Sequence, residues 1–91
     1  MKFEWDEKKA AVNLSKHGIS FEEARTVFDE PLYVDFYDDP DHSDEEDRYI
    51  IVGESQQGNL LIVSYTERAD FIRLISARKV TRVEREVYEE G

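Results

Sequence analysis

The apolar residues of the chain recur with two different periods. After a short strand-like start, the first part of the chain has the period of a helix. Residues 2–5 alternate polar with aromatic side chains, which is typical of a strand with one buried face. From Glu7 to His17 the pattern predicts a helix, because Asp6 offers an N-cap oxygen and Gly18 stands where a left-handed C-cap residue is needed. We expect this helix to bury an apolar stripe made of Ala10, Ala11 and Leu14.

A second helix is predicted from Phe21. Ser20 and Glu23 have the spacing of a capping box, in which each side chain accepts a hydrogen bond from the other residue's backbone N–H. Pro31 ends the helix, since proline cannot continue the backbone hydrogen bonding. The apolar positions expected on its buried face are Phe21, Ala24, Val27 and Phe28.

From residue 32 onward the period changes to that of strands. Four segments are rich in branched and aromatic side chains, namely 32–37, 49–53, 60–66 and 71–77. The connections at 56–59 and 68–70 are short enough for hairpins, which predicts that the last three strands form an antiparallel meander.

A final helix is predicted from Thr81, where Thr81 and Glu84 form a second capping box, and we expect it to bury Val83 and Val87. The whole pattern predicts an α+β fold. It consists of a short N-terminal strand and two helices, then an antiparallel sheet and a C-terminal helix.

Length and composition narrow the class of protein. A chain of 91 residues provides one core, so we expect a single domain over residues 1–91. The absence of cysteine excludes disulfides, thiol catalysis and cysteine-based zinc sites, and it fits a reducing compartment. The first residues are charged and the apolar runs are shorter than a membrane span, so we expect a cytoplasmic protein with no membrane partner.

The net charge of -10, taken alone, argues against nucleic-acid binding. The distribution of the charged residues along the chain changes this interpretation. Residues 22–47 contain 12 acids and 1 base, whereas residues 68–85 contain 6 bases and 2 acids. One segment can therefore bind phosphate while the other meets a basic partner; the alternative is two ordinary solvated surfaces. Residues 38–47 include no apolar residue and are expected to be an exposed loop. A metal site at His42 in this loop is the less favoured interpretation, and we expect no metal or other cofactor.

Several segments, in this order and spacing, resemble the BrnT toxin family. They are Phe3-Glu4-Trp5-Asp6, residues 13–24, Asp41-His42-Ser43, and, as the best match, residues 73–78 followed by Glu84, Arg85 and Tyr88. The resemblance implies a RelE-like fold, translation arrest by RNA cleavage, and a complex with a BrnA-like antitoxin. That antitoxin carries a ribbon-helix-helix domain, so DNA would be contacted only through it. The acidic charge departs from several basic relatives with this fold.

RNA cleavage without a metal needs a proton acceptor, a proton donor and cations that stabilise the phosphorane-like transition state. His17 is the acid/base candidate, since imidazole exchanges protons near neutral pH; the alternative is that it caps the helix C-terminus. We expect Arg73, Arg78 and Arg82 to bind the phosphate, although salt bridges are the alternative for each. Because positions 73 and 78 differ by an odd number, their convergence requires the strand to end or bend near Ala77.

Five further residues are candidates for binding the RNA substrate. Lys9 and Lys16 lie two turns apart on nearly one helix face, and Arg68 lies in a hairpin. Ser76 and Tyr88 are close to the arginines in sequence. The alternatives are solubilising lysines, a solvated turn arginine and a packed tyrosine.

Two functions from different classes are consistent with the sequence. The first is a metal-independent endoribonuclease that acts as a toxin. The alternative is a catalytically silent RelE-like binding module that holds a basic partner in a transcription-repressing complex. The arginine cluster favours the enzyme, because a binding domain with an acidic surface would not need it.

Overall fold

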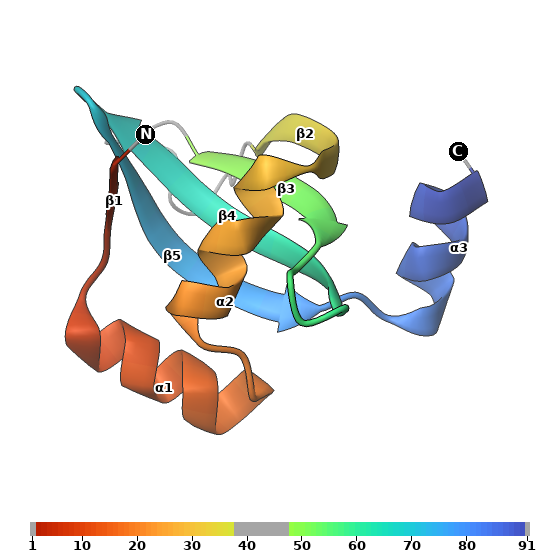
Figure 1. Cartoon of the computed structure of the whole chain (residues 1–91), viewed down its shortest axis with the longest axis horizontal. Helices are drawn as coiled ribbons and strands as arrows, with labels where there is room; N and C mark the ends of the chain where they lie inside the picture. Colours follow the sequence, from red (N-terminus) through yellow and green to blue (C-terminus); the bar gives the residue numbers. More distant parts are fainter. Residues whose placement is uncertain (1, 38–47, 91) are drawn as a thin grey trace.

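The computed structural model describes residues 2–37 and 48–90, and of residues 35–37 and 88–90 it describes the backbone alone. The elements follow the predicted order, which confirms the α+β class (Figure 1). They are β1 (Lys2–Glu4), α1 (Glu7–His17), α2 (Phe21–Arg25), the 3₁₀ helix η1 (Thr26–Asp29), β2 (Pro31–Tyr37), β3 (Arg48–Glu54), β4 (Leu60–Arg68), β5 (Phe71–Lys79) and α3 (Arg82–Glu90). The acidic segment 38–47 lies outside the described residues, so its expected exposure stays a prediction.

All five strands form one sheet in the order β1-β5-β4-β3-β2. Strands β2 to β5 are antiparallel neighbours, which confirms the predicted meander. Strand β1 adds to the sheet in parallel with β5, pairing Lys2 with Phe71 and Glu4 with Arg73. The N-terminal strand is therefore one edge of the sheet. The sequence predicted an antiparallel sheet and did not predict this parallel edge strand.

Strand β5 contains a bulge at Ile75. Ser76 pairs with Ser64 and Leu74 pairs with Tyr65, so two residues of β4 face three residues of β5. An extra residue of this kind leaves itself unpaired and shifts the alternation of side chains along its strand. Ile75 consequently belongs to neither regular row of β5.

The bulge also decides how two of the candidate arginines are related. Arg73 pairs with Thr66 and Arg78 with Ile62, and these two β4 residues are an even number apart, which puts both arginines on the same face of the sheet. Of the two possibilities expected near Ala77, the strand does not end there, since β5 continues to Lys79. The change of parity comes from the bulge two residues earlier, and a bulge bends its strand locally.

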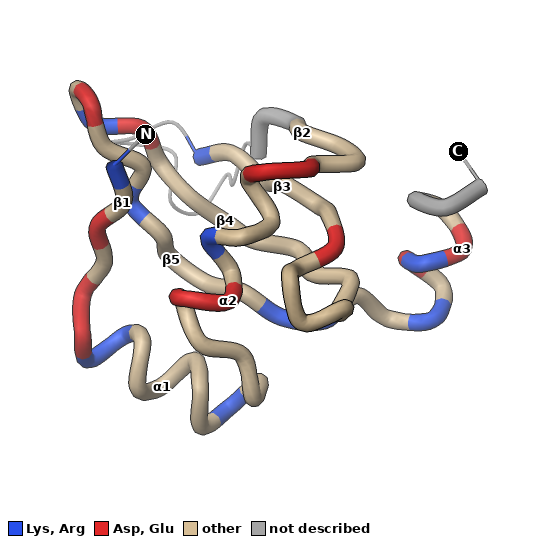
Figure 2. Tube along the Cα trace, viewed as in Figure 1, with Lys and Arg blue, Asp and Glu red and all other residues tan. Residues whose placement is uncertain are grey.

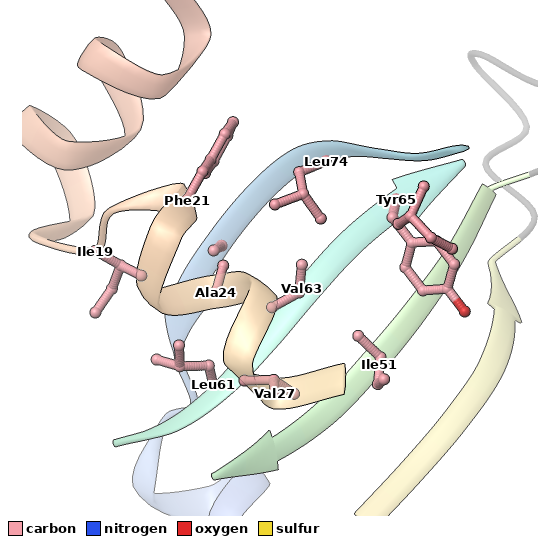
Figure 3. Packing of buried hydrophobic residues seen from close by; sticks show 11 residues of the cluster. Ile19, Phe21, Ala24, Val27, Ile51, Leu61, Val63, Tyr65 and Leu74 are labelled. Carbon is pink, nitrogen blue, oxygen red and sulfur yellow. The ribbon is translucent and has the colours of Figure 1, made fainter. Parts of the chain in front are cut away.

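The core lies between one face of the sheet and the segment formed by α2 and η1, which crosses the strands (Figure 3). Phe21, Ala24 and Val27 are at most 1% exposed, as the helical pattern predicted, and Phe28 packs its ring edge against Phe3 and Tyr65. The buried cluster consists of Ile19, Phe21, Ala24, Val27, Ile51, Leu61, Val63, Tyr65, Ile72, Leu74 and Ala77.

Helix α1 has the predicted ends but not the predicted buried face. An Asp6 carboxylate oxygen accepts from the backbone of Lys8 at 2.7 Å, and Gly18 closes the helix at φ +72°. The expected burial of the stripe is wrong for Ala11 and for Leu14, which is 52% exposed, while Ala10 is partly buried. The reason is that α1 lies beside β5 at the side of the sheet (Figure 1) and does not cover the sheet face.

The capping box of α2 is half formed. Ser20 Oγ accepts from the Glu23 N–H at 3.0 Å, as predicted. The Glu23 carboxylate turns away from Ser20 and accepts from Ser55 Oγ and Asn59 Nδ2, each at 2.7 Å, while only 8% of the residue is exposed. Two side-chain donors, one buried and one partly buried, stabilise the buried carboxylate more than one backbone N–H would, which explains why the reciprocal bond is not made.

Helix α3 has a complete capping box, and none of its side chains at residues 82–87, the ones that the structure describes, is buried. Thr81 N donates to Glu84 Oε1 at 2.8 Å, and Glu84 N donates back to Thr81 Oγ1 at 3.2 Å. The expected burial of Val83 and Val87 is wrong, since they are 69% and 62% exposed. The helix leaves the end of β5 and stands apart from the sheet (Figure 1), so the described chain offers it no surface to cover.

The ion pair between Arg78 and Glu84, which anchors the start of α3 to the end of β5, is expected to weaken in acid. The Arg78 guanidinium binds both Glu84 oxygens, at 2.8 and 3.0 Å. These bonds, followed by the Thr81 backbone bond, lower the pKa of Glu84 from 4.5 to about 2. A lowered carboxylate pKa stabilises the folded form above the unfolded value, and this contribution is lost as pH falls from 4.5 through about 2. Backbone ¹³C shifts of α3 should therefore move toward coil values across that range.

Two variants separate this anchor from general acid unfolding. Glu84→Gln should reduce the pH dependence of the α3 shifts strongly, because the carboxylate that binds Arg78 in a two-bond ion pair is gone. Glu86→Gln, at an exposed position of the same helix, should retain it. Equal titration curves in both variants would contradict the assignment.

Candidate functional site

A cavity of about 320 Å³ opens between α1 and strand β5. The described residues that line it come from one side of the helix and from the bulged part of the strand. They are Lys8, Lys9, Val12, Asn13, Lys16, His17, Ile75 and Ser76.

The cavity is cationic in a strongly acidic protein. Three of its described lining residues are lysines and one is a histidine, and none of the lining residues that the structure describes is a carboxylate. Figure 2 shows lysines near both ends of α1, and acidic residues on α2 and on the chain that leads into β2. A site with this lining attracts anions, and the nearby apolar walls strengthen the attraction by excluding water.

Asn13 attaches the floor of the cavity to the sheet. It is 5% exposed, and its Nδ2 donates to Ile19 O at 2.9 Å and to Ala77 O at 2.8 Å. Its Oδ1 accepts from Ala77 N at 3.1 Å. The amide thus pairs with the edge of β5 beyond the part that β1 covers, and it fixes α1 beside the strand.

His17 is the last residue of α1 and is partly buried beside Lys16 at the cavity. The alternative role for His17 was to cap the helix carbonyls. Gly18 supplies such a cap, because its N–H donates to Leu14 O at 2.9 Å. The C-terminal turn therefore does not depend on the imidazole for this hydrogen bond, which leaves the side chain available to the cavity.

The cavity brings together four of the residues that the sequence singled out: His17, Lys9, Lys16 and Ser76. Sequence reasoning missed the other lining residues Lys8, Val12, Asn13 and Ile75. Asn13 had one detectable signal, because it shares the helical spacing of Ala10 and Leu14 and so places a polar side chain on the expected apolar stripe.

The three candidate arginines do not appear among the described lining residues. Arg73 forms an ion pair with Glu4 at 3.3 Å, Arg78 binds Glu84, and Arg82 is exposed in the first turn of α3. Arg73 and Arg78 are three and two residues from Ser76 along β5, which corresponds to roughly 7 to 10 Å of strand. They flank the cavity along the same strand.

The remaining predicted positions lie elsewhere. Arg68 is exposed at the end of β4, beside a turn in which Ala69 has φ +50°. The Tyr88 side chain and His42 lie outside the described residues. Within the described part of the chain, no group of three His, Cys, Asp or Glu side chains has the arrangement of a metal site.

A second cavity, of about 560 Å³, is acidic. Its described lining comes from η1, the start of β2 and the end of β3, and includes Asp29, Glu30 and Glu54 beside the apolar Leu32. Leu32 of β2 is 59% exposed in this cavity, and Val34 of the same strand is 52% exposed. Two acids of the 22–47 segment, Asp29 and Glu30, therefore lie beside an exposed apolar side chain of β2.

Comparison with known proteins decides the family. Residues 5–84 match the family described as the ribonuclease toxin BrnT of type II toxin-antitoxin systems. The chain belongs to the BrnT family. No curated protein sequence matches it. Its structure is similar to the 1.1 Å crystal structure of the Brucella abortus ribonuclease toxin BrnT, with a TM-score of 0.67 and 26% identity, over 90% of this chain and 99% of the Brucella one.

Membership confirms the expected resemblance and fold. This BrnT protein is a ribonuclease toxin of a type II toxin-antitoxin system, so an antitoxin is its partner and RNA its substrate. Among the described residues, no helix has both the length and the apolar character needed to cross a bilayer. The cavity between α1 and β5 has a lining of cationic side chains that suits an RNA phosphate.

Proposed function

We propose that this BrnT toxin is a metal-independent endoribonuclease whose active site is the cavity between α1 and β5. The observation that carries the proposal is the position of His17 in a cavity with three lysines and no described carboxylate. An imidazole and several cations supply both requirements of metal-free RNA cleavage, proton transfer and stabilisation of the phosphorane-like transition state.

The proposed reaction starts with the attack of the RNA 2′-oxygen on the adjacent phosphorus. His17 accepts the 2′-hydroxyl proton, the bond from phosphorus to the 5′-oxygen breaks, and the imidazolium or a water molecule protonates the leaving oxygen. Lys9 and Lys16 stabilise the extra negative charge on the non-bridging oxygens. Ser76 contributes a hydroxyl at the opposite wall.

The arginines extend this site along the RNA. Arg73 and Arg78 flank Ser76 on β5, and Arg82 follows at the start of α3. We place them on phosphates on either side of the scissile bond, where RNA would replace Glu4 and Glu84 as the partner of each guanidinium. Arg68 and Tyr88 are proposed as further RNA contacts toward the two ends of the site.

We further propose that a BrnA-like ribbon-helix-helix antitoxin neutralises the toxin, and that the pair contacts DNA only through the antitoxin. The acidic cavity around Asp29, Glu30 and Glu54 supports a basic antitoxin segment, because opposite charges steer association. Because the proposed RNA cleavage would arrest translation, we propose the cytoplasm as the place of activity.

Cleavage is expected to persist in excess EDTA. The cavity offers a single imidazole and no described carboxylate, so its described residues lack the ligand set of a catalytic transition metal. Antitoxin-free protein should cut single-stranded RNA in EDTA, and addition of a BrnA-like antitoxin should stop the reaction. The measurement is the appearance of fragments on a denaturing gel.

Three outcomes would oppose this proposal. Activity lost in EDTA and restored by zinc or magnesium would end the metal-free mechanism. Continued cleavage with saturating antitoxin would remove the antitoxin assignment. Absence of cleavage from folded protein under all conditions would favour the silent binding module.

A further inference from the structure

Val12 is an exposed apolar residue surrounded by lysines. Lys8 lies four residues before Val12, Lys9 lies three residues before it, and Lys16 lies four residues after it. Residues three or four apart are neighbours on a helix surface, so all three lysines lie next to Val12. Val12 is 62% exposed, and it lines the cavity together with these lysines. Packing within the described chain does not account for a valine at this position.

Ile75 provides the opposite apolar wall. It is the unpaired bulge residue of β5 and is partly buried, and it lines the same cavity. Bulges re-aim a side chain out of the regular row of its strand. The cavity therefore combines two branched apolar side chains, one from a helix and one from a strand, with a cationic rim.

We propose that Val12 and Ile75 form a subsite for one unpaired nucleobase of the RNA, which deepens the proposed ribonuclease function and rests on it. A nucleotide has the two properties that the cavity matches, an anionic phosphate and a base with flat faces that gain from leaving water. The lysines hold the phosphates, and the base lies between the two aliphatic walls.

The subsite makes the toxin selective for unpaired RNA. A cavity of about 320 Å³ is at the lower end of the size of small-ligand sites, which suits a single nucleotide. A base enters only after it leaves its helix, and unstacking costs a few kcal/mol in a duplex but much less in a single strand. Binding energy from the base is consequently available only with single strands.

Equilibrium binding tests the subsite separately from cleavage. The probe is a short fluorescent 2′-O-methyl RNA, which lacks the nucleophilic hydroxyl and is not cut, and fluorescence anisotropy reports its affinity. Wild-type protein should bind the single strand more tightly than the same sequence in a duplex. Val12→Ser should weaken single-strand binding by about fivefold or more, since the base loses an apolar wall.

Leu14→Ser is the matched control. Leu14 is 52% exposed on the same helix but lies outside this cavity and lines a different hollow with Trp5 and Phe21. Its replacement should leave the affinity within about twofold. Circular dichroism of both variants establishes that each is folded.

A backbone without bases completes the test. An abasic oligonucleotide should bind wild-type protein and the Val12→Ser variant equally, because only phosphates remain to be bound. Equal losses in the valine and leucine variants, a Val12 effect that persists with the abasic strand, or equal affinity for single strand and duplex would each overturn the subsite. Normal binding of 2′-O-methyl RNA by a protein that fails to cut ordinary RNA would instead refute the proposed function and leave the subsite standing.

Discussion

Replacing His17 with alanine is expected to lower the rate of RNA cleavage by about 10² to 10⁴-fold, the usual contribution of a positioned acid or base. Imidazole is the side-chain group that commonly serves as a general acid or base, and His17 is the one imidazole among the described residues that line the cavity. Single-turnover cleavage in EDTA measures the chemical step directly. Affinity for 2′-O-methyl RNA should change little, since the lysines remain.

The control for this experiment is Ser15→Ala. Ser15 is exposed on α1 two residues before His17 and does not line the cavity, so its loss should leave the cleavage rate within about twofold. The folded state of His17→Ala should also survive, because Gly18 caps the helix through its backbone. A cleavage rate for His17→Ala equal to that of the control would assign His17 to the helix end and remove it from catalysis.

Asn13→Leu is expected to lower the free energy of unfolding by about 3 kcal/mol or more, from the desolvated groups it would leave unpaired. Leucine has the same number and branching of side-chain heavy atoms but makes none of the three hydrogen bonds. It would leave Ile19 O and both backbone groups of Ala77 without their Asn13 partner in a buried place. Urea unfolding followed by circular dichroism measures the change. The cavity should also lose its shape, because α1 is no longer fixed to β5.

Lys16→Leu separates the loss of Asn13 from the arrival of leucine. It introduces the same side chain at an exposed position of the same helix, where substitutions usually change stability by no more than about 0.5 kcal/mol. If Asn13→Leu behaves like Lys16→Leu, the three hydrogen bonds contribute nothing net to the fold. The amide would then not be what holds α1 to the sheet.

The ends of the helices could be predicted because they depend on local chemistry. Asp6 and Gly18 set the limits of α1 through hydrogen bonds within a few residues, and Thr81 with Glu84 does the same for α3. Burial could not be predicted from the same segments. Leu14 and Val83 have the spacing of buried residues, yet both are exposed because no element among the described residues covers their side of the helix.

The candidate site also contains residues whose proximity could be predicted from the sequence and others whose proximity could not. Lys9, Lys16 and His17 share a helix face, so their proximity follows from the helical repeat alone. Ser76 joins them only because α1 packs beside β5, which depends on bonds from Asn13 to residues up to 64 positions away. The ion pairs of Arg73 and Arg78 likewise required the positions of Glu4 and Glu84.

The sequence by itself determined the element types, most of their boundaries and the meander, because period, capping and turn residues act over short distances. Tertiary structure decided the rest. It made β1 a parallel edge strand, placed the bulge at Ile75, turned Glu23 toward Ser55 and opened the cationic cavity beside α1. Each of these depends on which buried groups find partners across the fold, and the cost of leaving such groups unpaired is settled only when distant segments meet.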